Sequence, residues 1–119
     1  PEVAPRMEES SVGWLPLDPA VANAFLAWPI KLVEYMAAGL PVVASDLPIQ
    51  AKVIHDADCG IVVDALNPEA HAKAMVKLLR NHAEIQRMGS NGKRAALSLY
   101  TWEVESDKLQ SLYRTLVRA

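Results

Sequence analysis

The sequence predicts one α/β domain, a Rossmann-like parallel sheet flanked by helices. Three short apolar runs, at 11–17, 41–44 and 60–63, are typical of strands. Segments with helical patterning separate these runs, and strands that alternate with helices pair in parallel through right-handed crossovers. The 119 residues suit a single domain. Because doubly wound sheets usually have about five or six strands, we interpret the chain as the later part of such a domain.

The composition narrows the class of protein. Hydrophobic residues make up 51% of the chain and charged residues 22%, which is typical of a globular domain with a core. The net charge of −2 and the scattered basic residues indicate no nucleic-acid partner. Cys59 is the single cysteine, so we expect no internal disulfide and a cytoplasmic setting. No signal-peptide pattern opens the chain and no apolar run approaches the roughly 20 residues that cross a bilayer, although peripheral association with the inner face of the membrane stays open.

The first 28 residues carry the weakest patterns. A short helix is predicted around Val3–Glu9, followed by a strand in 11–17 that breaks at Pro16. Residues 18–28 have no clear period and are interpreted as a loop with at most one helical turn. The large apolar side chains of this loop are Phe25, Leu26 and Trp28. We interpret them as cover for the core; lining a pocket or meeting another domain are the alternatives.

The stretch from Pro29 to Asp46 gives the clearest prediction. Residues 30–38 are rich in helix formers, and residues 41–44 form a short apolar run that predicts a buried strand. Between them, Gly39 is expected to end the helix in the left-handed conformation, and Pro41 cannot continue a helix.

Lys31 and Glu34 are the charged residues of that predicted helix. They lie three residues apart on one face near the helix N-terminus, where unpaired N–H groups and the positive end of the helix dipole attract anions. Two interpretations stay open at this point. The residues form either an ordinary surface ion pair, which contributes about 0.2–0.5 kcal/mol, or a charged patch that faces a ligand crevice.

Two elements follow the second strand. Ser45 and Asp46, at its end, are either ligand contacts or a turn residue and a helix cap, because open parallel sheets bind ligands at the C-terminal ends of their strands. A short helix is then expected at 49–55. Its inward residues are Ile49, Val53 and Ile54.

The last part of the sequence predicts five more elements, a strand at 60–63 and four helices. Asn67 caps the first helix, ahead of Pro68 and Glu69. The expected apolar stripe of this helix consists of Ala70, Ala74, Met75, Leu78 and Leu79. The glycine-containing segment 88–92 is predicted to separate a short helix from a longer one that ends near Tyr100.

The final helix is predicted at Trp102–Arg118, with Thr101 as its cap. Its apolar stripe consists of Leu109, Leu112, Tyr113 and Leu116. No metal site is assigned, because the three histidines are dispersed and no Cys or carboxylate cluster accompanies them.

Five blocks carry a resemblance to a known family. From Val12 to Tyr113 the chain contains, in order, VGWLPL, PIKLVEYMAAGLPVVASD, CGIVVDALNPEA, MGSNGKRA and YTWEVESDKLQSLY. This series resembles the C-terminal, donor-binding domain of family-4 glycosyltransferases with the two-domain GT-B architecture. The resemblance implies that residues 1–119 are a partial C-terminal nucleotide-sugar-binding domain, incomplete at its N-terminal side. It also implies that residues 101–118 form the terminal helix that crosses the interdomain cleft.

The resemblance implies a function. GT-B enzymes of this type transfer a hexosyl group from a nucleotide-diphosphate sugar to an acceptor, with retention of configuration, in glycan or polysaccharide synthesis. The acceptor is held by the other, N-terminal domain, which we expect as a partner. No metal or other cofactor is required, so protein charges and helix N-termini stabilise the departing diphosphate. We expect the isolated fragment to be inactive, and the sequence assigns no catalytic residue.

The site residues follow from the same resemblance. A glutamate at the position of Glu34 typically accepts hydrogen bonds from the ribose hydroxyls, which suits a carboxylate. A second glutamate, eight positions earlier, is expected to contact the donor sugar, but this chain has Leu26 there. Backbone N–H groups near the start of the helix face the diphosphate, and a cationic side chain adds charge. The predicted donor-binding residues are Glu34, Lys31, Trp28, Pro29 and Ile30, of which Lys31 is our own addition.

Two other functions remain as alternatives: a noncatalytic interaction module derived from the GT-B fold, and an enzyme like the nucleotide-sugar epimerases. The sequence leaves the nucleotide base, the sugar, the acceptor, the linkage and the oligomeric state undetermined.

Overall fold

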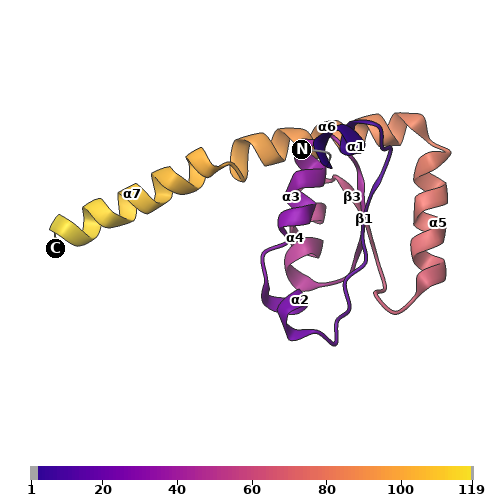
Figure 1. The fold of residues 1–119 in the computed structure, drawn as a ribbon, viewed down its shortest axis with the longest axis horizontal. Coiled ribbons are helices and arrows are strands. Elements are labelled where there is room, and N and C mark those ends of the chain that lie inside the picture. The colour runs from indigo at the N-terminus through magenta and orange to yellow at the C-terminus, as the bar shows by residue number, and fades with distance from the viewer. Residues whose placement is uncertain (1–2, 119) are drawn as a thin grey trace.

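The computed structural model describes residues 3–118 and contains three parallel strands in one sheet. The strands are β1 (Gly13–Leu15), β2 (Val42–Ser45) and β3 (Gly60–Val63), in the spatial order β1-β2-β3. In the register, Gly13 pairs with Val42 and Val42 pairs with Gly60. The predicted parallel α/β architecture is therefore confirmed (Figure 1).

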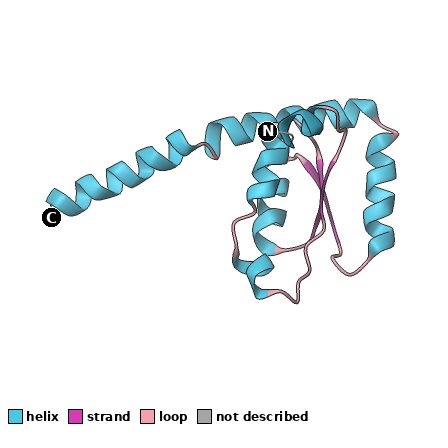
Figure 2. Cartoon of the chain, viewed as in Figure 1, coloured by secondary structure: helices cyan, strands magenta, loops and turns pink. Residues whose placement is uncertain are grey.

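Seven helices accompany the sheet in the part of the chain that the structure describes (Figure 2). The bounds are α1 Val3–Glu8, α2 Ala22–Leu26, α3 Ile30–Ala37, α4 Pro48–Ala57, α5 Pro68–Leu79, α6 His82–Leu99 and α7 Trp102–Arg118. α3 and α4 cover one face of the sheet and α5 covers the other, while α6 runs across one end of both layers (Figure 1). The predicted helices at 30–38, 49–55 and 102–118 are confirmed to within a few residues.

The central strand β2 separates two apolar clusters. All four of its residues are buried, and alternate side chains enter opposite clusters because successive residues of a strand face opposite sides. Val42 and Ala44 join residues of α3 and α4, whereas Val43 joins residues of α5. Burying both faces of this strand explains why its sequence is continuously apolar rather than alternating.

The predicted break at residues 88–92 is wrong, because α6 continues without interruption from His82 to Leu99. Its two glycines are buried and lie against the body of the domain. A Cβ atom at Gly89 would overlap the carbonyl oxygen of Gly39, and one at Gly92 would lie 3.1 Å from the Cβ of Cys59. These glycines therefore allow close helix packing instead of marking a turn.

Predicted helix ends are mostly confirmed. Gly39 follows α3 with φ of 76°, the left-handed conformation that favours glycine. The Asn67 side chain accepts a hydrogen bond from the Ala70 amide at 3.0 Å at the start of α5. The Thr101 hydroxyl accepts one from the Val104 amide at 3.3 Å in α7. Asp46 is not a cap, since the residue before α4 is Leu47.

Two expectations about apolar side chains are wrong. The large side chains of residues 18–28 do not cover the core, because Leu26 is 77% exposed and the two aromatic residues are about half exposed: Phe25 and Trp28. In α5, Leu79 is 58% exposed and His71 is buried in its place. The helix is rotated so that His71, Ala74 and Leu78 face the sheet.

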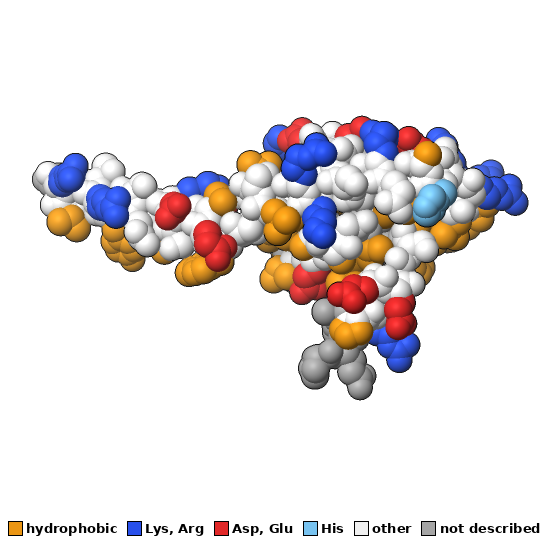
Figure 3. Space-filling model, turned by 90° about the horizontal axis from the view of Figure 1, so that it is seen from above, with side chains coloured by type: hydrophobic (Ala, Val, Ile, Leu, Met, Phe, Trp, Pro, Cys, Tyr) orange, Lys and Arg blue, Asp and Glu red, His pale blue; other side chains and the backbone are white. Residues whose placement is uncertain are grey.

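The helix α7 projects from the body as an arm, so the molecule measures 55 × 31 × 28 Å (Figures 1 and 2). No residue of α7 is buried. Hydrophobic side chains gather along one side of it, as the space-filling view shows (Figure 3). The predicted stripe is therefore present, but nothing in residues 3–118 covers it: Leu109, Leu112, Tyr113 and Leu116 are all exposed.

Candidate functional site

The C-terminal ends of the three strands all lie at the same end of the sheet, because the strands are parallel. We call this end the C-terminal edge. In Figure 1 this is the lower edge, where α2 and the loop after β3 lie. Helix α3 runs back along the sheet after β1, so its first turns are the part of α3 closest to this edge. Open α/β sheets bind ligands at this edge, which makes the start of α3 the candidate site.

Glu34 and Lys31 are both exposed on α3. Within residues 3–118 neither side chain forms an ion pair or a hydrogen bond, so the surface ion pair considered from the sequence is not present in the structure. Four hollows on the surface of the described residues are lined by residues other than Lys31 and Glu34. An exposed carboxylate without a protein partner is available to accept hydrogen bonds from a ligand.

The backbone at the start of α3 leaves one amide open. The Ile30 amide donates to the Trp28 carbonyl at 3.0 Å, and the Leu32 amide donates to the Pro29 carbonyl at 3.1 Å. The Lys31 amide, between them, makes no backbone hydrogen bond within the described residues, and no side chain caps the helix. Such free first-turn amides, together with the helix dipole, favour an anion.

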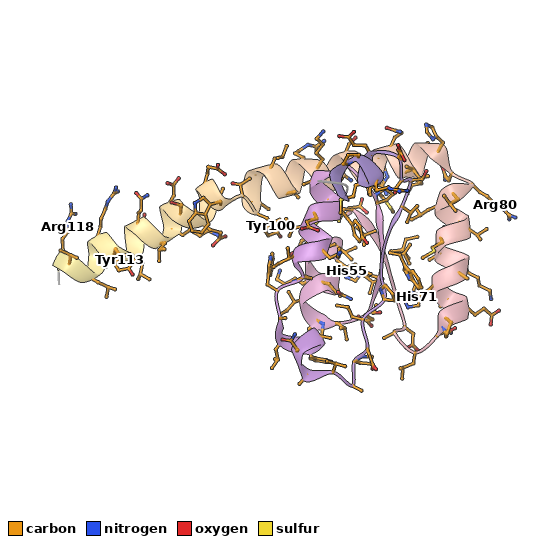
Figure 4. All side chains as sticks on the ribbon, viewed as in Figure 1. His55, His71, Arg80, Tyr100, Tyr113 and Arg118 are labelled. Carbon is orange, nitrogen blue, oxygen red and sulfur yellow. The ribbon has the colours of Figure 1, made fainter. Side chains whose placement is uncertain are left out.

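Trp28 lies beside this turn, but its ring points toward Tyr100 and not toward the Lys31 amide. It packs against the ring of Tyr100, with centroids 5.4 Å apart and planes at 50°. Tyr100 directly follows the last residue of α6, and Figure 4 places it at the junction with α7. The aromatic pair borders a surface hollow of about 690 Å³, whose other lining residues come from the junction: Leu99, Val104, Glu105 and Lys108.

Ser45 links three segments at the edge of the sheet. Its hydroxyl accepts a hydrogen bond from the Leu17 amide at 2.9 Å. Its carbonyl accepts bonds from the Leu47 amide, at 2.9 Å, and from the Gln50 side chain. Ser45 is 1% exposed, and the Gln50 Oε1 atom is buried without a hydrogen-bond partner in the described residues.

The sequence analysis did not identify Gln50 as a site residue. The available signal was a polar residue on the inward side of α4, where Val53 and Ile54 are apolar. Ser45, by contrast, was a candidate, and in the structure it is the last residue of β2, where its hydroxyl holds the Leu17 backbone. Asp46 is exposed, and its amide donates to the Val63 carbonyl at 2.8 Å.

A second buried polar group lies on the opposite face of the sheet. The Trp14 indole N–H donates to His71 Nδ1 at 3.3 Å, and the two rings meet edge to face with centroids 6.2 Å apart. His71 is buried, and its Nε2 atom has no hydrogen-bond partner within residues 3–118. This pair joins β1 to α5 and takes no part in the candidate site at α3.

Three sets of ionisable side chains have shifted pKa values. In α4, the Asp56 carboxylate raises the pKa of Lys52 through a hydrogen bond and its charge. Burial raises the pKa of the Cys59 thiol to about 11, so the thiol stays protonated near neutral pH. Hydrogen bonds from Arg87 lower the pKa values of the Asp58 and Glu84 carboxyl groups. These groups connect α6 to the end of α4 and serve the packing of the fold.

Within residues 3–118, no group of three or more His, Cys, Asp or Glu side chains is placed to hold a metal ion. The absence of a metal requirement therefore stays a prediction. Among the helices of the described part of the chain, none combines the length and the apolar character that a membrane span needs.

Two solved structures share the fold. Sucrose-phosphate synthase from Thermosynechococcus elongatus superposes with a TM-score of 0.85 and 24% identity, covering 98% of this chain and 28% of that one. WaaG, a glycosyltransferase involved in lipopolysaccharide biosynthesis, superposes with a TM-score of 0.70 and 21% identity, covering 90% of this chain and 28% of that one. The fold is therefore that of the GT-B glycosyltransferases.

The family model for glycosyl transferases group 1 matches residues 25–95. The chain belongs to this family, as the resemblance predicted. Phosphatidyl-myo-inositol mannosyltransferase of Mycobacterium leprae is 41% identical over 87 residues, which are 73% of this chain and 23% of that protein. MMP alpha-(1->4)-mannosyltransferase of Mycolicibacterium hassiacum is 24% identical over 117 residues, 98% of this chain and 27% of that protein. The chain thus spans about a quarter of the length of the curated relatives it matches.

Proposed function

We propose that residues 1–119 are the donor nucleotide-sugar-binding part of a longer, retaining glycosyltransferase. The enzyme transfers a hexosyl group from a nucleotide-diphosphate sugar to an acceptor in glycan or polysaccharide synthesis, in the cytoplasm. Membership of the glycosyl transferases group 1 family supports this proposal, and so do relatives that are named mannosyltransferases. An acceptor-binding domain outside residues 1–119 is the partner, and this fragment alone is inactive.

The observation that carries the proposal is the exposed carboxylate of Glu34 in the second turn of α3, which has no partner among residues 3–118. Its two oxygens accept hydrogen bonds from the two neighbouring hydroxyls of a ribose, and bonds to a charged acceptor are among the stronger ones in proteins. Because no protein group competes for these oxygens within residues 3–118, the carboxylate is free for a ligand.

The diphosphate is assigned to the preceding turn. The open Lys31 amide and the positive end of the α3 dipole attract its oxygens, and the Lys31 side chain supplies a full positive charge. Pro29 has no N–H to donate, and the Ile30 amide is already bonded to Trp28. Of the predicted contacts in this turn, Lys31 therefore has the best support from the geometry.

The donor sugar lies beyond the diphosphate, on the side of α2. Leu26 is exposed there and cannot accept a hydrogen bond from a sugar hydroxyl, unlike the acid that the family resemblance leads us to expect. We assign the polar contacts to the sugar to groups outside residues 1–119. Leu26 contributes apolar contact only.

The test is a titration of the isotope-labelled chain with UDP, GDP and ADP, followed by amide chemical shifts. We expect one of the three to shift the amides of residues 28–34. Glu34→Ala should raise the dissociation constant about tenfold or more, because hydrogen bonds to a charged group contribute about 1.5–3 kcal/mol. Glu103→Ala, which removes another exposed carboxylate on α7, is the matched control and should leave the affinity unchanged.

The outcomes separate the candidate functions. No shift with any of the three nucleotides contradicts donor recognition and favours the noncatalytic interaction module. Shifts that persist unchanged in Glu34→Ala support nucleotide binding at a different place. Product analysis of the complete enzyme distinguishes sugar transfer from epimerisation.

A further inference from the structure

The segment from Leu17 to Trp28 directly precedes the proposed donor-binding turn. Its middle part makes few contacts with the rest of the domain. The segment joins β1 to α3 and contains α2, a helix of five residues with none buried. No side chain caps α2, and Leu26 at its end is largely exposed. The position of the turn at Pro29 therefore depends on how the two ends of the segment are fixed.

The first end is fixed by Ser45. The Leu17 amide donates to the Ser45 hydroxyl at 2.9 Å, in a part-buried setting. Ser45 is itself immobilised, because it ends the central strand and its carbonyl receives bonds from Leu47 and Gln50. A hydrogen bond shielded from water by its surroundings holds its partner more firmly than an exposed one.

The second end is fixed by Tyr100. The Trp28 ring packs on the Tyr100 ring, and Trp28 is the residue immediately before Pro29, which precedes α3. Tyr100 is half-buried and packs against the cluster of α3, α4 and β2. This ring contact therefore ties the start of α3 to the end of α6, a helix whose buried residues lie at positions 88–96.

We propose that Ser45 and Tyr100 are positioning residues of the donor site: they fix the two ends of the segment Leu17–Trp28 and so set the turn that presents Lys31 and Glu34. This inference rests on the proposed donor-binding function. Neither residue touches the nucleotide in this account. Both act through backbone placement, Ser45 through Leu17 and Tyr100 through Trp28.

Each residue has a matched pair of variants. Ser45→Ala removes the hydroxyl that accepts the Leu17 bond, whereas Ser45→Thr keeps it. Tyr100→Leu removes the aromatic ring, whereas Tyr100→Phe keeps it. Hydrogen exchange of the Leu17–Trp28 amides is measured without ligand, the dissociation constant is measured for UDP, GDP and ADP, and urea unfolding gives the global stability of each variant.

We expect Ser45→Ala to speed exchange of the Leu17 amide about fivefold and to weaken nucleotide binding by a similar factor. Tyr100→Leu should weaken binding about threefold to tenfold through the lost ring contact. Ser45→Thr and Tyr100→Phe should stay close to the wild type in both measurements. Amides of α5, on the other face of the sheet, should exchange as before at matched global stability.

Two results overturn the proposal. If Ser45→Ala and Tyr100→Leu lose global stability but bind nucleotide as the wild type does, these residues are structural only. If exchange across Leu17–Trp28 does not change in either variant, the ends are held by other contacts. Failure of the wild type to bind any of the three nucleotides is a different outcome: it contradicts the donor-binding function itself, while the exchange data still show whether the two contacts anchor the segment.

Discussion

Helices α6 and α7 have nearly the same length, 18 and 17 residues, and both show an amphipathic pattern, yet their surroundings differ completely. α6 buries one side against both layers of the domain, through Met88, Gly89, Gly92 and Ala96. α7 has no fully buried residue, and its large apolar side chains are exposed (Figure 3). An amphipathic pattern therefore indicates that a face can be covered, but it does not show what covers it.

The residues in the two stripes explain the difference. The buried side of α6 includes glycines, because the backbone of Gly39 and the side chain of Cys59 approach closely. The stripe of α7 consists of long and aromatic side chains, which suit a partner that stays at side-chain distance. Small residues in a helical stripe thus indicate that another segment of the fold packs closely against the helix. The large residues of α7 indicate only that one face of the helix is apolar.

Among substitutions in α6 and α7, the largest effect is expected from Gly89→Ala in α6. The new methyl group would overlap the Gly39 carbonyl, and backbone cannot move aside as a flexible side chain can. Such overpacking typically costs about 1–3 kcal/mol, and we expect the upper end of this range, measured as the free energy of unfolding in urea. Ser90→Ala, on the exposed side of the same helix, is the control. Equal stability of Gly89→Ala and Ser90→Ala would show that α6 does not pack as described.

A smaller effect is expected from Arg87→Gln. It breaks the ion pair that ties α6 to Asp58 at the end of α4, and a second ion pair, with Glu84, within α6. Arg87 lowers the pKa values of the Asp58 and Glu84 carboxyl groups in the folded state. Their contribution is therefore present above the ordinary carboxyl pKa of about 4 and is lost as the pH falls through the lowered values. The wild type should lose more stability than the variant between pH 7 and about pH 3.

The control for this prediction is Lys108→Gln in α7, whose ion pair with Glu105 lies within that helix. It should leave the pH dependence of unfolding as in the wild type. All these side chains are substantially exposed, so the difference between wild type and Arg87→Gln is expected to be modest and to shrink in high salt. Parallel curves for wild type and Arg87→Gln would contradict the assigned contacts.

The smallest effect is expected from Leu112→Ala in α7. This side chain is exposed, so the free energy of unfolding should change by no more than about 0.5 kcal/mol. Leu78→Ala, at a buried position of α5, should cost about 2–5 kcal/mol and serves as the contrasting variant. A large loss in Leu112→Ala would mean that the α7 stripe is covered in solution, and a dependence on protein concentration would identify a second copy as the cover.

The sequence predicted the strands and most helices because local signals agree there. Asn67 and Pro68 start α5, Gly39 ends α3, and the apolar run at 60–63 is a strand. The prediction failed at Gly89 and Gly92, where a residue type that usually ends helices is required by a neighbour distant in sequence. Such contacts are properties of the assembled fold, which a local pattern does not contain.

The candidate site also combines features that the sequence predicts with contacts that only the folded structure reveals. Glu34 was predicted as a donor contact from the family resemblance, since its spacing from Lys31 alone left an ordinary ion pair open, and the structure leaves its carboxylate exposed. The links from Ser45 to Leu17 and from Trp28 to Tyr100 join residues 28 and 72 positions apart, so spacing along the chain gives no indication of them. The exposure of Leu26 likewise follows from tertiary packing rather than from its apolar character.

The most direct test of the account compares a nucleoside diphosphate with its 2′,3′-dideoxy analogue, using wild type and Glu34→Ala and the nucleotide that binds. If Glu34 holds the ribose hydroxyls, the wild type should bind the dideoxy analogue about tenfold or more weakly, and Glu34→Ala should bind both ligands equally. The same preference for the hydroxyls in both proteins would contradict the assignment of Glu34 as the donor contact.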